Sequence, residues 1–301
     1  MIRIGVDFGG TKIEAAALDS AGAFAARVRR PNPGDYQGAI QVVCQLIAEA
    51  EQAAGVSGAS VGVGIPGSLS PATGLMRNAN SVWLNGKPFK EDLEAALGRP
   101  IRLENDANCF ALSEALGGAA DGAEVVFGAI LGTGCGGGVV VRGKTIEGIN
   151  RIGGEWGHTP LPWPSAEERD SRRCWCGRID CLETYISGTA FTADYVRAGG
   201  EALSGEAIME RVRTGEPRAC EVFDQYVDRL GRALAVLCDI LDPDVIVFGG
   251  GMSNVQALYE RVLTPVRRYV FSDVFATTIV PARFGDSSGV RGAAWLWPQS
   301  P

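Results

Sequence analysis

The sequence is poor in several features that mark particular classes of protein. It contains a single histidine, and its 28 lysines and arginines are outnumbered by 35 aspartates and glutamates, which gives a formal net charge of −7. A nucleic-acid-binding surface needs a basic patch, and this charge balance argues against one. No uncharged apolar run approaches the roughly 20 residues that a membrane-spanning helix requires. We therefore expect neither nucleic acid nor a membrane as a partner.

The amino terminus also lacks the pattern of a secretory signal peptide. Residues 1–7 are interpreted as the start of a strand, without the charged segment, apolar segment and small-residue cleavage site of a signal. Five of the eight cysteines are scattered through apolar patterns, and we interpret them as buried, reduced thiols: Cys44, Cys109, Cys135, Cys220 and Cys238. Together these observations predict a cytoplasmic protein.

The chain has the composition of an ordinary globular protein, with 46% apolar and 21% charged residues among 301. Strands alternate with helices along it, which predicts an α/β fold. A glycine-rich interruption at 117–122 suggests an N-terminal domain of residues 1–118 and a C-terminal domain of residues 119–288, with a helix near 289–298 as a candidate to complete the first domain. Strands are expected at 2–7, 13–18, 23–28, 60–65, 101–104, 125–131, 138–142 and 245–248, and helices at 38–54, 89–97, 107–116, 216–241 and 292–297.

Two glycine-rich turns each join a pair of apolar strands, at residues 7–12 and 132–134. Glycine lets the backbone approach an anion closely, and successive N–H groups form a nest for phosphate oxygens. Asp7, at the end of the first strand, is placed to hold Mg²⁺ through water. The first turn is neither a Walker A loop nor a GxGxxG motif, which indicates a different ATP-binding fold. The repeated unit suggests an internal duplication, although two ordinary hairpins, the first capped by Asp7, remain an alternative.

A third glycine cluster, Gly249–Gly251, follows the strand at 245–248, and a helix is expected directly after it. Here the backbone would allow an adenine or a ribose to lie against it, and close packing of a helix on a strand explains the glycines equally well. The residues expected to hold the nucleotide are Asp7, Gly9, Gly10, Thr11, Lys12, Gly132, Thr133, Gly134, Gly249 and Gly250.

Asp106 lies at a junction between a strand and a helix, directly after Glu104 and Asn105. Aspartate is favoured at the N-cap of a helix, so a purely structural role is one interpretation. The other is a general base that accepts a proton from an attacking hydroxyl, while Asn105 orients the substrate. The two roles do not exclude each other.

The only histidine, His158, precedes Cys174, Cys176 and Cys181. One histidine and a Cys-x-Cys-x₄-Cys run supply four ligands suited to zinc, and structural zinc sites are closed at four ligands. Zinc would therefore hold the loop rather than activate water, and the second imidazole nitrogen would be left to donate to a substrate hydroxyl. Glu155 and Glu183 flank these ligands. A core histidine beside unrelated cysteines is the alternative.

The segment 78–85 is rich in amides and contains one aromatic residue. This composition suits sugar hydroxyls, and Asn78 and Asn80 are candidate sugar ligands, although an ordinary surface loop looks much the same. Gly67, just after the strand at 60–65, is expected to line the same cleft.

Taken together, these motifs resemble the ROK family of sugar kinases and sugar-responsive repressors over essentially the whole chain. The resemblance implies two RNase-H-like domains of the actin/hexokinase type around a cleft, a homodimer, and phosphorylation of a hexose by ATP with Mg²⁺ and a structural Zn²⁺. It implies that Asp106 is the base and that Asn105, Glu155, His158 and Glu183 bind sugar hydroxyls. The segments that carry it are Asp7–Lys12, Glu104–Asn108, Leu131–Gly138, Glu155–His158, Cys174–Glu183 and Gly249–Gly251.

Residues 78–85, 158–163 and 285–297 look most like those of bacterial fructokinases (manno-fructokinases), which predicts conversion of D-fructose to fructose 6-phosphate. Residues 102–115 are equally close to bacterial N-acetylglucosamine kinases, so N-acetylglucosamine, mannose and glucose remain alternative substrates. A sugar-sensing repressor without its DNA-binding domain is a distant alternative, because the first strand is expected to begin at Ile2 and to leave no room for a helix-turn-helix.

Overall fold

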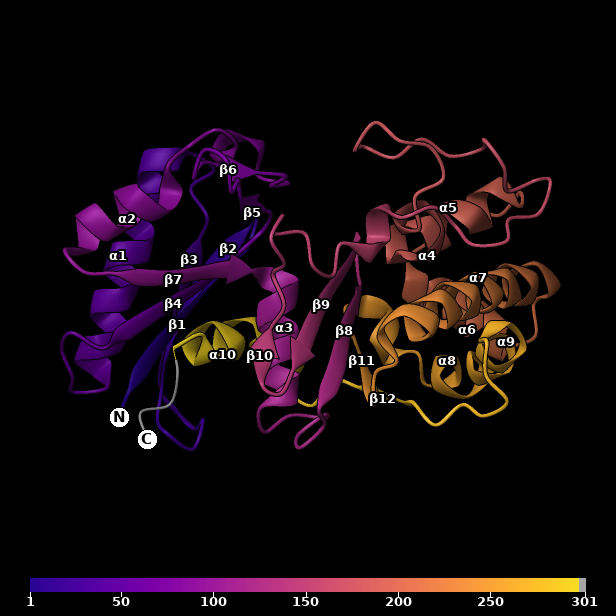
Figure 1. Ribbon diagram of the computed structural model, residues 1–301. Coiled ribbons are helices and arrows are strands. Elements are labelled where there is room, and N and C mark those ends of the chain that lie inside the picture. Colours follow the sequence, from indigo (N-terminus) through magenta and orange to yellow (C-terminus); the bar gives the residue numbers. More distant parts are fainter. Residues whose placement is uncertain (298–301) are drawn as a thin grey trace. The chain divides into compact units, whose positions relative to one another are not determined.

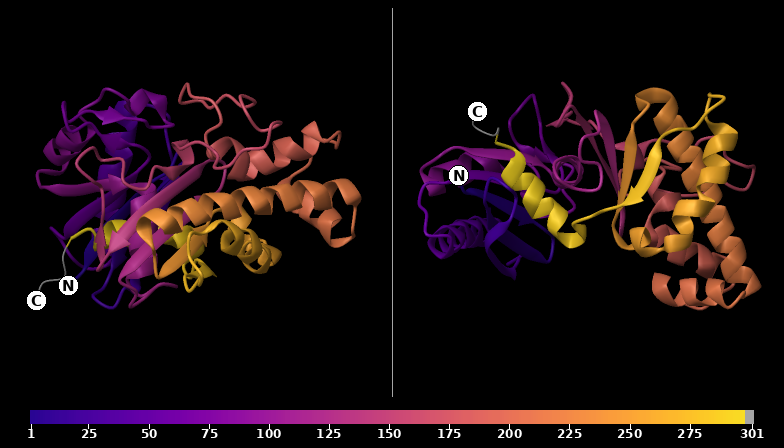
Figure 2. Two further views of the ribbon diagram at one scale, coloured as in Figure 1. Left: turned by 45° about the vertical axis from the view of Figure 1, so that its right-hand side comes forward. Right: turned by 90° about the horizontal axis from the view of Figure 1, so that it is seen from below.

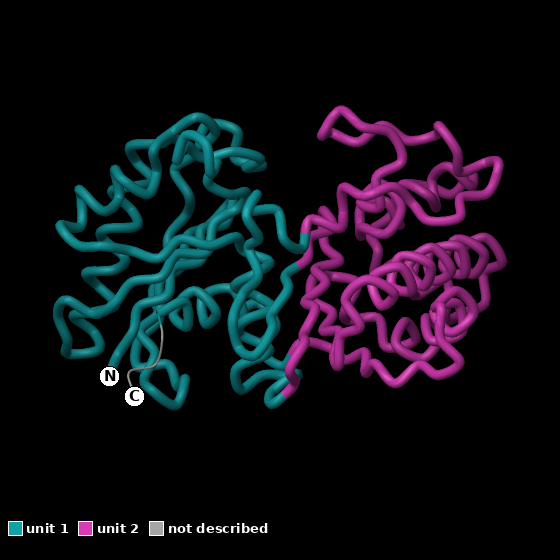
Figure 3. Tube along the Cα trace, in the orientation of Figure 1, with its two compact units in different colours: residues 1–122, 138–154, 283–301 teal, residues 123–137, 155–282 magenta. Residues whose placement is uncertain are grey.

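The structure is a computed structural model that describes residues 1–297, and it divides into two compact units (Figure 3). Unit 1 contains residues 1–122, 138–154 and those from 283 onward, and unit 2 contains residues 123–137 and 155–282. The first crossing, after Gly122, lies at the end of the glycine-rich interruption in the sequence. The chain returns to unit 1 for residues 138–154, and no sequence pattern predicted this second crossing. Residue 298, the expected end of the closing helix, lies outside the described residues.

Unit 1 is built on a five-stranded sheet of order β3-β2-β1-β4-β7 (Figure 1). Pairs β1–β2 and β2–β3 are antiparallel, whereas β1–β4 and β4–β7 are parallel. The carboxyl ends of β1, β4 and β7 therefore lie side by side, which brings the turns that follow them to one edge of the sheet. The strands are β1 Arg3–Phe8, β2 Lys12–Leu18, β3 Phe24–Pro31, β4 Ser60–Ile65 and β7 Ile101–Asn105.

Alternate residues of β1 and β4 face different helices, as the twofold period of a strand requires. Ile4, Val6, Val61 and Val63 belong to the core that includes α1 (Tyr36–Ala53). Gly5 and Gly62 face α10 (Ser288–Trp295), where a Cβ on either would lie 1.9 Å from a carbonyl oxygen of the helix. Glycine at these two positions therefore lets α10 lie directly on the sheet (Figure 2).

Helix α3 (Asp106–Ala115) packs against α10 at a third glycine. A Cβ on Gly292 would lie 1.7 Å from the carbonyl oxygen of Cys109, so the two backbones touch. Glu114 of α3 is fully buried and accepts hydrogen bonds from Arg283 N at 2.9 Å and Ser288 Oγ at 2.7 Å. The C-terminal segment is thus fixed to unit 1 by both packing and hydrogen bonds.

The remaining elements of unit 1 are α2 Phe89–Leu97, the short strands β5 Ser68–Leu69, β6 Met76–Arg77 and β10 Lys144–Thr145, and the 3₁₀ turns Val82–Leu84 and Gly285–Ser287.

The second sheet has the order β10-β9-β8-β11-β12, with parallel pairing of β8–β11 and β11–β12. Its strands are β8 Val125–Leu131, β9 Cys135–Val141, β11 Val245–Gly249 and β12 Thr278–Pro281, and β9 passes from unit 2 into unit 1 at Gly138. The long helix α7 (Pro217–Leu241) buries an apolar face and packs along α9 (Leu263–Tyr269). Among residues 1–297, no helix is both long and apolar enough to cross a bilayer.

Several elements of unit 2 differ from the sequence-based expectation. A 3₁₀ turn (Gly251–Asn254) follows the glycine cluster, and helix α8 (Gln256–Arg261) starts only after it. Four helices had no sequence signal: α4 Glu183–Ile186, α5 Gly188–Arg197, α6 Gly205–Arg213 and α9 Leu263–Tyr269. The five scattered cysteines are free thiols as expected, but Cys44 and Cys220 are only half-buried.

Candidate functional site

The first glycine turn joins β1 to β2 and is supported by Asn32, just beyond β3. Asn32 Nδ2 donates to Gly9 O at 2.8 Å, and Asn32 N donates to Thr11 O at 2.9 Å. A Cβ on Gly9 would lie 2.8 Å from Lys12 O, which explains glycine there. Thr11 and Lys12 are exposed, as residues that bind a phosphate must be. Asn32 was not predicted, because a contact over 23 residues leaves no local pattern.

Asp7 ends β1 in surroundings that disfavour its charge. The pKa of its carboxyl is raised to about 6, mainly by burial and next by the charge of Glu14, while Lys12 acts in the opposite direction. A cation beside Asp7 would compensate this cost, so the residue fits the expected Mg²⁺ position better than it fits a simple hairpin cap.

The junction between β7 and α3 places Asp106 at the first position of the helix. Asn105 is the N-cap, with its Oδ1 accepting from Ala107 N at 2.9 Å, so the N-cap interpretation of Asp106 is wrong. Asp106 Oδ1 also accepts from Ala107 N, at 2.8 Å. A carboxylate in the first turn is favoured by the helix dipole, which supports an ionised Asp106 that can accept a proton.

The buried carboxylate of Glu104 holds the junction between β7 and α3 through hydrogen bonds. Its carboxylate accepts from Asn105 N at 2.8 Å, Asn108 Nδ2 at 3.0 Å and Thr145 Oγ1 at 3.3 Å. Burial raises the pKa of Glu104, and the nearby charge of Glu147 acts in the same direction. These contacts connect β10 to the start of α3, so we assign Glu104 a positioning role.

Three predicted sugar ligands of unit 1 lie close to one another. Asn105 Nδ2 donates to Gly67 O at 3.2 Å. Gly67 has a φ of 79°, and a Cβ there would lie 2.4 Å from Arg77 O, immediately before Asn78. Asn78 and Asn80 are exposed on either side of Ala79, whose backbone N and O are both bonded to the side chain of Asn85. The amide-rich segment is therefore a held loop whose Asn78 and Asn80 remain accessible.

The second glycine turn is held by two segments of unit 2. Gly188 N donates to Gly132 O at 2.7 Å, and Thr189 Oγ1 donates to Thr133 O at 2.6 Å. Gly250 has a φ of 76°, and a Cβ there would lie 2.8 Å from Gly132 N. The Gly249-Gly250 segment and the turn at 132–134 therefore adjoin, as a shared nucleotide site requires.

His158, Cys174, Cys176 and Cys181 come together as the sequence predicted. Their ligand atoms all lie within 4.8 Å of one another. The Sγ atoms of Cys176 and Cys181 are 3.6 Å apart, and Cys174 Sγ lies 3.6 Å from His158 Nδ1. A tetrahedron with Zn–S bonds of about 2.3 Å and a Zn–N bond of about 2.0 Å has edges of roughly 3.8 Å and 3.5 Å. The donor set thus fits a four-coordinate zinc ion.

Glu183 links this cluster to the second glycine turn. One oxygen accepts from Cys135 N at 3.0 Å, and the other accepts from Trp175 Nε1 at 2.7 Å. The ring of Trp175 meets the ring of His158 edge-on at 5.1 Å. Glu155, by contrast, is exposed at the start of the 3₁₀ turn Trp156–His158.

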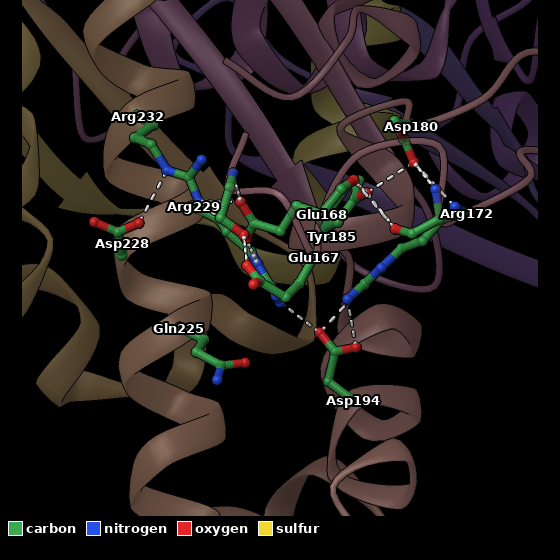
Figure 4. A network of polar contacts seen from close by, with 12 residues as sticks. Glu167, Glu168, Arg172, Asp180, Tyr185, Asp194, Gln225, Asp228, Arg229 and Arg232 are labelled. Carbon is green, nitrogen blue, oxygen red and sulfur yellow. Dashed lines mark hydrogen bonds and ion pairs between the residues drawn. The ribbon is translucent and has the colours of Figure 1, made fainter. Parts of the chain in front are cut away.

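A buried ionic network lies beneath the cysteine loop (Figure 4). Arg229 of α7 bridges Glu168 at 2.6 Å and Asp194 at 2.7 Å, and Arg172 contacts Asp194 at 2.8 Å. Burial alone would raise the pKa of Glu168, but the hydrogen bond from Arg229 and the charge of Arg232 lower it. The network fixes the segment before the cysteines to α5 and α7, and sequence reasoning missed it.

The predicted residues fall into two groups, one in each unit. Each group includes one glycine turn, so both units carry a phosphate-type motif beside candidate sugar ligands. Unit 1 contains Asp7, Gly9, Gly10, Thr11, Lys12, Gly67, Asn78, Asn80, Asn105 and Asp106, and unit 2 contains Gly132, Thr133, Gly134, Glu155, His158, Cys174, Cys176, Cys181, Glu183, Gly249 and Gly250.

Comparison with known proteins matches residues 3–300 to the ROK family. The chain belongs to the ROK family. Among its ROK relatives is the N-acetyl-D-glucosamine kinase of Salmonella paratyphi C, 41% identical over 297 residues, which cover 97% of this chain and 98% of the relative. This finding favours the alternative substrate, N-acetylglucosamine, over the fructose that three segments had suggested.

Solved ROK structures support the fold. The ROK hexokinase from Thermus thermophilus is 34% identical, with a TM-score of 0.87 and coverage of 98% of this chain and 97% of that one. A ROK family glucokinase from Streptomyces griseus, in complex with glucose and AMPPNP, is 28% identical, with a TM-score of 0.80 over the full length of both chains. This ROK chain therefore has the two-domain α/β fold of the family's sugar kinases.

Proposed function

We propose that this ROK-family protein transfers the γ-phosphoryl group of ATP to a hydroxyl of a hexose, and that the hexose is N-acetyl-D-glucosamine. The observation that carries the substrate assignment is the 41% identity to an N-acetyl-D-glucosamine kinase across 97% of the chain. D-Fructose, suggested by shorter segments, becomes the comparison substrate.

In this proposal Asp106 accepts the proton of the attacking hydroxyl. Glu104 and Asn105 hold the junction at the start of α3 by hydrogen bonds, and Asp106 Oδ1 itself accepts from Ala107 N at 2.8 Å. Phosphoryl transfer depends on positioning and on stabilisation of charge more than on covalent chemistry, so a fixed base beside a held hydroxyl is what the reaction needs.

The two glycine turns would hold the phosphates of ATP through their backbone N–H groups. Mg²⁺, bound near Asp7, would neutralise charge on the β- and γ-phosphates. Asn78, Asn80, Asn105, Gly67, Glu155, His158 and Glu183 would contact the sugar. Both carboxylate oxygens of Glu183 already accept hydrogen bonds, so its part includes holding the cysteine loop against the turn.

We also propose that the four-residue cluster holds one structural Zn²⁺. The tetrahedral fit of the sulfur and nitrogen positions supports this, and His158 Nε2 is then the nitrogen left for a sugar hydroxyl. Zinc so placed would order the loop from Cys174 to Glu183 without taking part in phosphoryl transfer.

The test is ADP release with Mg²⁺-ATP and N-acetylglucosamine, fructose, mannose or glucose. We expect the highest kcat/KM for N-acetylglucosamine; a higher value for fructose would reverse the substrate assignment. Asp106→Asn should lower kcat by at least ~100-fold, the usual scale for a general base, while sugar binding measured by calorimetry persists. The exposed Asp273→Asn is the matched control. Turnover retained in Asp106→Asn would remove that residue from the role.

A further inference from the structure

Trp175 stands between Cys174 and Cys176 in the cysteine loop and is 64% exposed. A single exposed apolar side chain carries no function by itself. The contacts of this one are specific: Nε1 donates to Glu183 Oε1 at 2.7 Å, and the ring meets that of His158 edge-on at 5.1 Å. Both partners are candidate sugar ligands, and the transfer reaction described above gives Trp175 no part.

The backbone next to these two ligands is already fixed. Leu182 N donates to Thr159 O at 2.8 Å, so the residue before Glu183 is bonded to the residue after His158. The side chain of Glu183 still has several rotatable bonds, and ordering such a side chain costs rotamer freedom. Its carboxylate therefore needs contacts of its own if it is to face a ligand in one orientation.

The carboxylate of Glu183 is held at both oxygens. Oε2 accepts from Cys135 N at 3.0 Å, and Oε1 accepts from Trp175. A Cβ on Gly134 would lie 2.6 Å from Oε2, so glycine at this position leaves the space that the carboxylate occupies. An ionised carboxylate can accept about four hydrogen bonds, which leaves acceptor capacity for a sugar hydroxyl.

We infer that Trp175 is a positioning residue for sugar binding, whose indole N–H holds the Glu183 carboxylate in the orientation that receives a sugar hydroxyl. This role rests on the proposed function, because it takes Glu183 and His158 as sugar ligands. A side chain that is fixed before the sugar arrives loses less freedom on binding. The contact therefore raises the affinity for the sugar without entering the chemical step.

Trp175→Phe removes the N–H and keeps an aromatic ring beside His158. We expect the Kd for N-acetylglucosamine, measured by calorimetry without ATP, to rise roughly tenfold, as for the loss of a hydrogen bond to a charged group. In the ADP-release assay KM should rise with it while kcat stays unchanged, because the sugar contact is made equally before and in the transition state.

Trp163→Phe is the matched control. Trp163 also belongs to unit 2, is 51% exposed, and its ring contacts that of Tyr269 at the same centroid distance of 5.1 Å. Its replacement should leave the Kd and the KM for the sugar unchanged.

A double-mutant cycle shows whether Trp175 acts through Glu183. In a Glu183→Ala background, adding Trp175→Phe should change kcat/KM for the sugar by less than about twofold, since the group that the indole holds is already gone. A full further loss in that background would show that Trp175 acts independently of Glu183 and would overturn the inference.

Zinc content and the urea midpoint separate positioning from support of the loop, and both should be the same in Trp175→Phe and in wild type. An unchanged Kd, an equal loss in Trp163→Phe, or a weaker Kd accompanied by loss of zinc would each overturn the inference. If wild type binds N-acetylglucosamine and transfers no phosphate to it, the proposed function fails while the calorimetry still decides on Trp175. If another hexose binds instead, the same titration with that hexose decides; a protein that binds none of the four overturns both.

Discussion

Replacing Asp7 by asparagine should make the protein more stable and inactive at the same time. The substitution keeps the shape of the side chain and removes its charge. The pKa of the Asp7 carboxyl is about 6, against an ordinary value of 3.8. Each pKa unit corresponds to about 1.4 kcal/mol, so the ionised carboxylate costs at most on the order of 3 kcal/mol of folding free energy. The true cost is smaller, because the side chain is only partly buried.

The stabilisation by Asp7→Asn should depend on pH in a definite direction. The folded protein holds this proton more tightly than the unfolded chain, so the contribution of Asp7 to stability falls as pH rises from about 4 to about 6. The difference in unfolding free energy between variant and wild type should therefore be small near pH 4, grow to pH 6 and stay constant above it. Comparing the two proteins at each pH cancels the other titrating groups.

Urea unfolding at pH 4.5, 6 and 8, without added Mg²⁺ or ATP, measures this difference. Steady-state assays at pH 8 with Mg²⁺-ATP should show a loss of turnover in the variant. A gain in stability with a loss of activity is what a residue kept for cation binding should give. A variant that is less stable than wild type at pH 8, or a stability difference that does not change with pH, would refute the reasoning about the buried charge. Full activity would show that Asp7 has no part in binding Mg²⁺.

Two further predictions concern unit 2. Metal analysis should find about one zinc per chain, and Cys176→Ser or prolonged chelation should lower this and weaken sugar binding; a metal-free protein with full activity would contradict the zinc site. Asp194→Asn should lower the free energy of unfolding by about 3–5 kcal/mol, because it leaves Arg172 and Arg229 buried without their common partner. The exposed Glu167→Gln is its control in urea unfolding, and equal midpoints for the two variants would disprove the importance of the network.

Much of the fold could be predicted because local patterns dictate it. The near-continuous small apolar strand at 60–65 and the helical spacing of the long α7 both appear in the structure. The role of Gly5 and Gly62 could not be predicted, because it depends on a helix more than two hundred residues away. The short helices α4 to α6 lacked a clear signal, since their packing depends on tertiary contacts more than on periodicity.

Some features of the candidate site could likewise be predicted from local sequence patterns, and others could not. His158 and the three cysteines could be grouped from their spacing, and their ligand atoms do converge. Asp106 was recognised at a strand–helix junction, but the N-cap turned out to be Asn105. The pairing of Arg229 with Glu168 spans 61 residues, and no pattern along the chain indicates which arginine meets which acid.

The insertion of unit 2 within unit 1 has a consequence for the order in which the protein folds. Synthesis delivers β1 and β4 early, whereas α10, which covers their glycine face, is made only after all of unit 2. During translation the backbone at Gly5 and Gly62 therefore stays uncovered, and the first unit completes its core only when residues 288–295 leave the ribosome. A fragment that stops at residue 282 would keep both glycine turns and still lack the helix on which the first sheet rests.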